Sequence, residues 1–186
     1  LGDREQIRRA RAFPYQLMAA YRAANGELSS ELTNALQQAM EIAIENVPQV
    51  EGKIFLCPDV SGSMHSAVTG FRKESTSKVR CVDAAALVST AFVRRNPTAE
   101  VIPFSDDVVQ IPKGKLNPYD SVMTNAEVLS TLPSGGTACS APLRHLNERN
   151  EKGDLVVYVS DNESWADFDG RHPAYGKRGG TVMAEE

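Results

Sequence analysis

Asp59, Ser61 and Ser63 are the residues of this chain whose types and spacing best support chemistry. They occupy alternate positions directly after the apolar run 54–58. One carboxylate and two neutral hydroxyls make an all-oxygen ligand set, which suits a hard divalent cation. We therefore expect a metal site at these residues, with Mg²⁺ as the first choice and Mn²⁺ or Ca²⁺ as alternatives.

The apolar run predicts a buried strand that ends in a turn. Asp59 then lies just past the carboxyl end of the strand, and in an open α/β sheet ligands bind in the crevice outside these ends. The more conservative interpretation is that the serines, glycines and aspartates of this chain act only as turn residues and helix caps.

The pattern Asp-x-Ser-x-Ser after a core strand resembles the metal-ion-dependent adhesion site of von Willebrand factor A domains. Ser134–Thr137 is similar to the second loop of that site, and Val156–Asp161 is similar to the strand and acid of its third loop. The resemblance implies that Thr137 supplies a further hydroxyl, directly or through water, and that Asp161 often acts through a water. It also implies a cation short of one ligand, which can recruit an acidic group from a partner.

The residues around these motifs resemble the Ro autoantigen family, which joins a ring of helical repeats, the TROVE module, to an A domain. The similar segments are Pro58–Met64, Gly135–Leu143, Ser160–Trp165 and, before the A domain, Arg11–Tyr21. The resemblance implies the metal-binding A domain of a ribonucleoprotein that binds small noncoding (Y) RNA and misfolded RNA for RNA quality control. RNA would be bound through an associated helical-repeat module. The alternative is a stand-alone divalent-metal adhesion module that binds an acidic group of a protein partner.

Two enzymatic interpretations compete with a binding site. A nucleophilic Ser61 or Ser63 would need an activating base, for which His65 is the nearest choice. The nucleophile pattern Gly-x-Ser-x-Gly is absent, and so is the phosphate-binding Gly-x-x-x-x-Gly-Lys that would support phosphoryl transfer at Asp59. We expect no catalytic role.

The overall charge balance argues against an extensive surface for binding nucleic acid. The formal net charge is −4, and residues 51–186 carry 15 basic against 18 acidic side chains. The first 24 residues differ, because they hold five arginines and two acids: Arg4, Arg8, Arg9, Arg11 and Arg22 against Asp3 and Glu5. We take Arg4, Arg8, Arg9 and Arg11 as candidate RNA contacts, with an ordinary solvated face as the alternative.

The composition is that of a soluble globular domain, with 41% hydrophobic and 24% charged residues. Three cysteines without a Cys-x-x-Cys pair argue against a disulfide framework and suit a reducing compartment. No signal peptide and no long apolar span are present. We expect a cytoplasmic protein without a membrane partner.

Strands and helices must alternate to position these loops. We predict strands near 53–58, 100–104 and 155–160, with helices near 82–96 and 123–131 and another beginning at Ser140 or Ala141. This order predicts an α/β fold with a doubly wound, mostly parallel sheet of the von Willebrand A, Rossmann-like type, preceded by a short helical segment. We expect residues 1–50 to resemble the end of the TROVE module. Residues 51–186 would form the A domain, lacking its last strands in this chain.

Overall fold

A three-stranded parallel sheet forms the centre of the computed structural model, which describes residues 3–23, 29–69 and 79–161. The strands are β1 (Ile54–Pro58), β2 (Glu100–Val101) and β3 (Leu155–Val159), in the order β2-β1-β3. β1 is buried along its whole length and pairs with both neighbours, so the predicted central strand is confirmed. The end of the predicted A domain, residues 162–186, lies outside the described residues.

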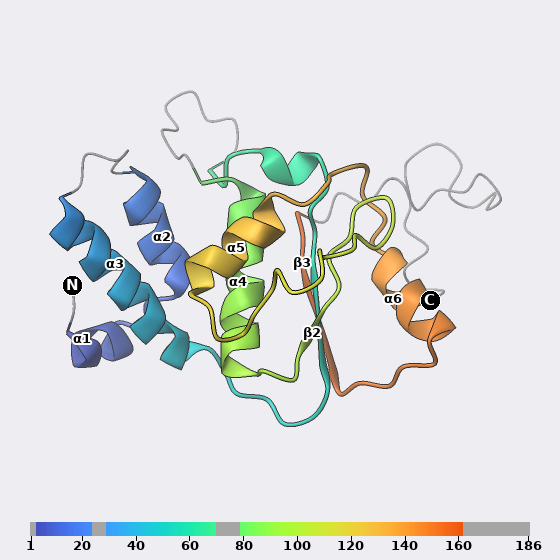
Figure 1. Cartoon of the computed structure of the whole chain (residues 1–186), viewed down its shortest axis with the longest axis horizontal. Coiled ribbons are helices and arrows are strands. Elements are labelled where there is room, and N and C mark those ends of the chain that lie inside the picture. Colours follow the sequence, from blue (N-terminus) through green and yellow to red (C-terminus); the bar gives the residue numbers. More distant parts are fainter. Residues whose placement is uncertain (1–2, 24–28, 70–78, 162–186) are drawn as a thin grey trace.

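Helices precede the sheet and connect its strands (Figure 1). Their bounds are α1 (Arg4–Arg9), α2 (Pro14–Ala23), α3 (Ser30–Ala43), α4 (Cys81–Arg95), α5 (Val122–Ser130) and α6 (Ala141–Glu148), with short 3₁₀ helices η1 (Ile44–Asn46) and η2 (Ser63–His65). Pro14 opens α2, and the Ser29 hydroxyl caps α3 by accepting the Leu32 N–H at 3.3 Å. Both starts agree with the sequence prediction.

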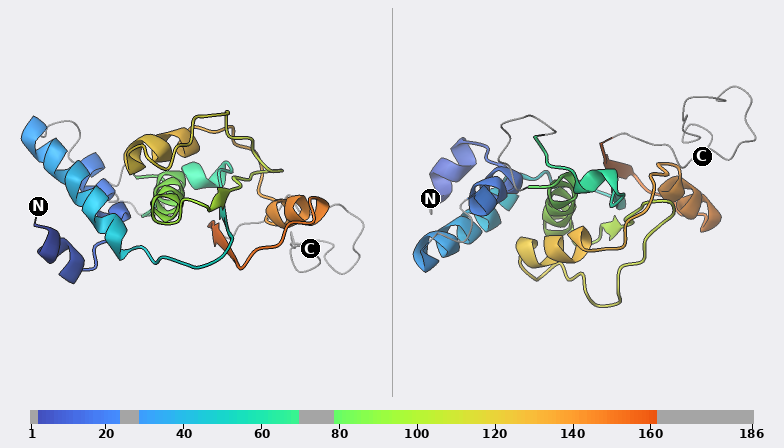
Figure 2. Two further views of the ribbon diagram at one scale, coloured as in Figure 1. Left: turned by 60° about the horizontal axis from the view of Figure 1, so that its bottom comes forward. Right: turned by 90° about the horizontal axis from the view of Figure 1, so that it is seen from above.

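Helices cover the two faces of the sheet, which makes the fold doubly wound. On one face Ile54 and Leu56 pack with Val93 of α4. On the other face Phe55 and Cys57 pack in one cluster with Leu146 of α6. Figure 2 shows α4 and α6 on opposite sides of the strands. The even and odd positions of β1 therefore point into separate apolar layers, as the period-2 alternation of a strand requires.

The ladder between β1 and β2 is shorter than predicted. Regular pairing covers Glu100–Val101, and beyond it only single bridges join Phe104 to Asp59 and to Val108. The Ile102 N–H donates to the Leu56 carbonyl at 2.8 Å. The Phe104 N–H still donates to the Pro58 carbonyl at 3.1 Å, so the chain stays beside β1 up to the candidate metal loop.

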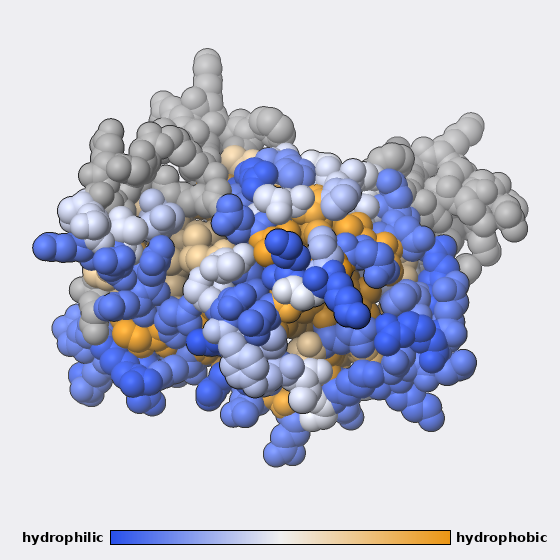
Figure 3. Space-filling model, viewed as in Figure 1, coloured by the Kyte–Doolittle hydropathy of each residue, from blue (hydrophilic) through white to orange (hydrophobic). Residues whose placement is uncertain are grey.

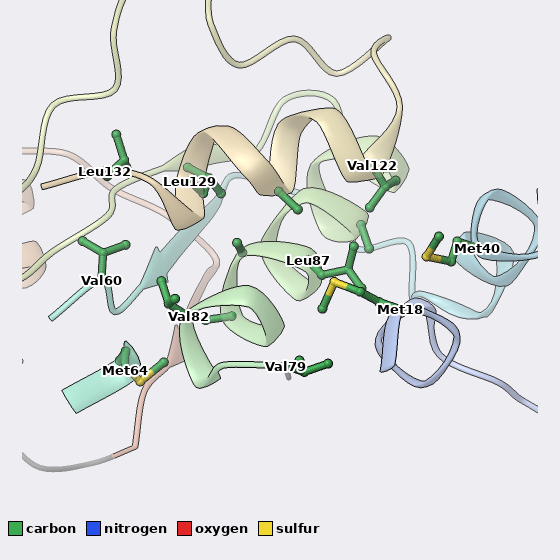
Figure 4. Packing of buried hydrophobic residues seen from close by; sticks show 14 of the residues in the cluster. Met18, Met40, Val60, Met64, Val79, Val82, Leu87, Val122, Leu129 and Leu132 are labelled. Carbon is green, nitrogen blue, oxygen red and sulfur yellow. The ribbon is translucent and has the colours of Figure 1, made fainter. Parts of the chain in front are cut away.

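The largest apolar cluster joins the N-terminal helices to the α/β part. Met18 of α2 and Met40 of α3 are each 1% exposed and lie in one cluster with Leu87 of α4. Figure 4 shows both methionines reaching toward α4. An apolar stripe runs along α3 and η1, in which Leu36, Met40 and Ile44 are buried, whereas Leu32 in the first turn is 37% exposed. The division at residue 50 stays a prediction, because the two parts share this cluster.

An ion-pair network lies at the amino end of β1. Glu151, in the connection between α6 and β3, pairs with Lys53 and accepts a 2.9 Å hydrogen bond from Arg149. The pKa of Glu151 lies below its usual value, chiefly because of the Lys53 hydrogen bond, with partial burial opposing the shift and the charges of Lys53 and Arg149 adding to it. Arg149 also forms an ion pair with Glu100 at 2.6 Å, so the network links the amino ends of all three strands.

The surface is mixed in character. On the face in Figure 3, hydrophilic residues predominate over the N-terminal helices, and a hydrophobic area lies near the centre. Within the described ranges 3–23, 29–69 and 79–161, the helices are all too short or too polar to cross a lipid bilayer.

Candidate functional site

The first metal loop brings its three predicted residues together at the carboxyl end of β1. Asp59 and Ser61 are both fully buried. The Ser61 N–H donates to Oδ1 of Asp59 at 2.8 Å, and the hydroxyls of Ser61 and Ser63 lie 3.2 Å apart. The loop turns here because η2 begins at Ser63. Three oxygen ligands of the predicted set therefore share one small turn.

The environment of Asp59 fits a cation. Its second oxygen, Oδ2, accepts a 2.6 Å hydrogen bond from the hydroxyl of Ser160. In the described part of the chain no lysine, arginine or histidine forms an ion pair with Asp59. A buried carboxylate is costly unless charge or hydrogen bonds compensate it. Two hydrogen bonds supply part of this compensation, and a bound divalent cation would supply the opposite charge.

The second loop meets the first through a backbone hydrogen bond. The Gly62 N–H donates to the Gly135 carbonyl at 2.9 Å, and a Cβ added at Gly62 would lie 3.4 Å from that same oxygen. Thr137, two residues farther along, is buried. The structure thus places the Thr137 loop beside the Asp59 loop, as the resemblance implied.

Asp106 is a positioning residue that the sequence interpretation missed. Its Oδ1 accepts the Gly136 N–H at 2.7 Å, and a Cβ added at Gly135 would collide with the Asp106 carboxylate. The neighbouring Ser105 carbonyl accepts the Ala138 N–H at 2.8 Å. Sequence reasoning treated this segment as an ordinary turn. Its place after a predicted strand, at the same sheet edge as Asp59, was the signal that could have identified it.

The third loop follows β3. The Asp59 N–H donates to the Val159 carbonyl at 3.0 Å, so the end of β3 lies beside the first loop. Asp161 is exposed at this end. Burial and the Asp161 carboxylate together raise the pKa of the Cys81 thiol, which places Asp161 near the first turn of α4. The rest of the third loop, including Trp165, lies outside the described residues.

His65 interacts with α4 and not with the serines. Its Nδ1 lies 3.0 Å from Nη1 of Arg80, whose guanidinium also donates to the buried Asp83 at 2.8 Å. No hydrogen bond joins His65 to Ser61 or Ser63 within the residues that the structure describes. This geometry gives no support to a serine nucleophile activated by His65.

The donor set depends on hydroxyls. Across residues 3–23, 29–69 and 79–161, no group of three or more histidines, cysteines, aspartates or glutamates is arranged to hold a metal ion. A site built from Asp59, Ser61, Ser63, Thr137 and Asp161 would instead combine two carboxylates with three hydroxyls. Such a set is suited to Mg²⁺, which keeps several waters.

The four arginines predicted to contact RNA lie on one side of the N-terminal helices. All four are exposed, and they line a hollow of about 580 Å³ together with Glu5, Glu45 and Asn46: Arg4, Arg8, Arg9 and Arg11. Arg9 pairs with Glu5 at 2.7 Å, and Arg4 pairs with Glu45. The hydrogen bond from Arg4 holds the pKa of Glu45 below its usual range. Phosphate binding by these residues stays a prediction.

A family model described as the Ro60 vWA domain matches residues 53–175. Two relatives are named RNA-binding protein RO60. The one from Caenorhabditis elegans is 28% identical over 182 residues, which cover 89% of this chain and 26% of the relative. The one from Deinococcus radiodurans is 28% identical over 135 residues, which cover 73% of this chain and 24% of the relative.

A solved structure has the same fold. The crystal structure of the Deinococcus radiodurans RO (RSR) protein matches with a TM-score of 0.65 and 23% sequence identity, over 88% of this chain and 34% of that chain. The chain spans about a quarter of the length of the curated relatives that it matches.

Proposed function

Because the chain belongs to the Ro60 vWA domain family, we propose that it is the metal-binding A-domain portion of a Ro-like RNA-binding protein. The relatives from Caenorhabditis elegans and Deinococcus radiodurans carry the name RNA-binding protein, which supports the RNA part of this proposal. We further propose that the whole protein binds small noncoding RNA and misfolded RNA in RNA quality control. The A domain has no catalytic step of its own in this proposal, and the protein acts in the cytoplasm.

The observation that carries the metal proposal is the meeting of three loops at one end of the sheet. The loops after β1 and β3 are tied by the Ser160–Asp59 hydrogen bond, and the Thr137 loop is tied to the first loop through Gly62 and Gly135. If these residues served only to make turns, nothing would require a fully buried carboxylate where the loops meet, because burying a charge is costly.

The protein groups would hold the cation through oxygen atoms. Asp59 would supply formal charge, Ser61, Ser63 and Thr137 would add neutral lone pairs, and Asp161 would act directly or through water. The cation would supply positive charge that attracts an acidic group of a partner. Mg²⁺ is the proposed resident ion, with Mn²⁺ and Ca²⁺ as alternatives.

RNA binding is assigned to the helical segment and to an associated helical-repeat module. A local arginine excess lies near the N-terminus, whereas residues 51–186 as a whole are mildly acidic, with 15 basic and 18 acidic side chains. Counterion release from RNA would therefore contribute little to binding by the α/β part.

The second candidate function is a stand-alone adhesion module that binds a protein carboxylate. The mildly acidic α/β part and its hydroxyl-rich metal loop favour this alternative, because neither feature needs RNA. Filter binding with RNA and calorimetry with Mg²⁺ separate the two. RNA binding by the chain, with metal binding that depends on Asp59, supports the Ro-like function. Metal-dependent binding of an acidic peptide without any RNA binding supports the adhesion module.

A further inference from the structure

The carboxylate of Glu45 lies among three arginines that come from two different parts of the fold. Arg4 pairs with it, with Nε 3.3 Å from Oε2, and Nε of Arg8 lies 4.0 Å from the same oxygen. Arg95, in the last turn of α4, lines a second hollow with Arg4 and Glu45. Its charge adds to the attraction that lowers the pKa of Glu45.

The packing of the helices explains this convergence. η1, which contains Glu45, packs against α4, and α1 packs against α3 just before η1. Figure 1 shows η1 between α1 and the final turn of α4. The hollows on either side of Glu45 measure about 580 and 350 Å³ and share Arg4 and Glu45. They therefore form one open surface across the helical segment and the α/β part.

We propose that Arg4, Arg8 and Arg95 bind a phosphate of RNA, and that the carboxylate of Glu45 occupies the phosphate position when RNA is absent. This inference rests on the proposed RNA-binding function. It adds a residue of the α/β part, Arg95, to the RNA surface, and it assigns Glu45 the role of an internal competitor.

The chemistry of the groups supports the exchange. A guanidinium donates parallel hydrogen bonds to a carboxylate or to a phosphate, so the arginines that hold Glu45 can hold a phosphate in the same way. The lowered pKa of Glu45 keeps its side chain charged at neutral pH, and the competitor is therefore an anion. The Arg4 side chain is exposed and that of Glu45 is partly exposed, and ion pairs open to solvent contribute little stability, so breaking this pair costs little free energy.

RNA fits this surface better than a single acidic side chain does. Arg9, which pairs with Glu5, and Arg11 also line the larger hollow and provide further cationic groups there. A chain of phosphates can use successive contacts, whereas one carboxylate uses one. Arg94 also lines the smaller hollow, but we assign it no phosphate, because it already donates to the carbonyl of Pro118 at 2.8 Å and lies 3.8 Å from Glu41.

The test measures binding of a labelled single-stranded uridine 12-mer to the full chain at several salt concentrations. Glu45→Gln should tighten binding roughly twofold to fivefold at low salt, because it removes the competing charge. Arg95→Gln should weaken binding by a similar factor and reduce the salt slope by about one. Glu100→Gln and Arg149→Gln are matched controls, since these residues form an exposed ion pair elsewhere and should leave the affinity unchanged.

Each outcome is decisive. Binding by the wild type with no change in either variant overturns this inference and leaves the RNA-binding function intact. Absence of RNA binding by the wild type and by Glu45→Gln overturns the inference together with the assignment of RNA contacts to this chain. If a polyglutamate peptide binds more tightly than RNA and responds to both substitutions, the surface recognises an acidic protein and the RNA assignment is wrong.

Discussion

The hydroxyl of Ser160 donates a 2.6 Å hydrogen bond to Oδ2 of Asp59. This bond joins the ends of β1 and β3 at the point where the metal is proposed to bind. The other oxygen, Oδ1, accepts the Ser61 N–H at 2.8 Å. The two hydrogen bonds therefore hold the carboxylate in one orientation before any ligand binds. Because the bonded groups follow β1 and β3, the positions of these strands also fix the direction of the remaining lone pairs.

Asp59 should control metal affinity. Asp59→Ala should abolish Mg²⁺ binding because it removes the main formal charge of the ligand set, whereas Ser61→Ala and Ser63→Ala should each weaken binding less. Asp59→Asn keeps the size and one acceptor oxygen, so it separates charge from packing. Isothermal calorimetry with Mg²⁺ and Mn²⁺ measures the affinities. Unchanged affinity in a folded Asp59→Asn variant would mean that the metal site is wrongly assigned.

Asp106 should act on metal affinity through the Thr137 loop. Asp106→Ala removes the acceptor of the Gly136 N–H and should weaken Mg²⁺ binding, whereas Asp106→Asn keeps an acceptor oxygen and should retain most of it. In a Thr137→Ala background, Asp106→Ala should cause no further loss. Amide hydrogen exchange at Gly136 reports the contact without metal. If the Gly136 amide exchanges at the same rate in the wild type and in Asp106→Ala, the Asp106 contact does not position the Thr137 loop.

RNA binding should depend on the N-terminal arginines and on salt. An isolated 51–186 segment should bind RNA weakly, because its charges nearly balance. Removing residues 1–50 also removes Met18 and Met40 from the core, so a full chain with all four arginines changed to glutamine is the cleaner comparison. Tight, salt-insensitive binding by either protein would place the RNA surface elsewhere.

The helical segment should contribute to the stability of the whole chain. Met40→Ala leaves a cavity beside α4 and should lower the free energy of unfolding by about 2–5 kcal/mol. Urea unfolding followed by circular dichroism measures the change, and Leu32→Ala on the exposed start of α3 is the control. A loss below about 0.5 kcal/mol for Met40→Ala would contradict the shared core.

The Glu151 network should stabilise the fold only above acidic pH. The pKa of Glu151 is lowered in the folded state, chiefly by the Lys53 hydrogen bond. A lowered pKa gives stability that is present above the unfolded value of about 4.5 and is lost as the pH falls through the folded value. Wild type should therefore melt at a higher temperature than Glu151→Gln at pH 7, and the two should converge near pH 3. A difference that persists at pH 3 would exclude this electrostatic origin.

The sequence predicts β1 and the turn that follows it at Asp59 well, because a continuous apolar run that ends at an acid and small polar residues has few other interpretations. It predicts β2 less well, because the residue types do not show where regular pairing stops and the single bridges of Phe104 to Asp59 and Val108 begin. The role of Asp106 was missed because it depends on a loop thirty residues away. The apolar stripe containing Met40 indicates a buried face, but a stripe does not identify its partners, and only the fold shows that it joins a cluster with Met18 of α2 and Leu87 of α4.

The length of α4 separates the two proposed sites. Its first turn lies beside the metal loops through Arg80 and His65, and its last turn holds Arg95. Fifteen residues rising 1.5 Å each make a rod of about 22 Å. The Debye length at physiological salt is about 8 Å, so the solvent screens most of the electrostatic interaction between charges at the two ends of the helix. RNA affinity at constant ionic strength should therefore be the same with and without Mg²⁺, unless the helix itself moves.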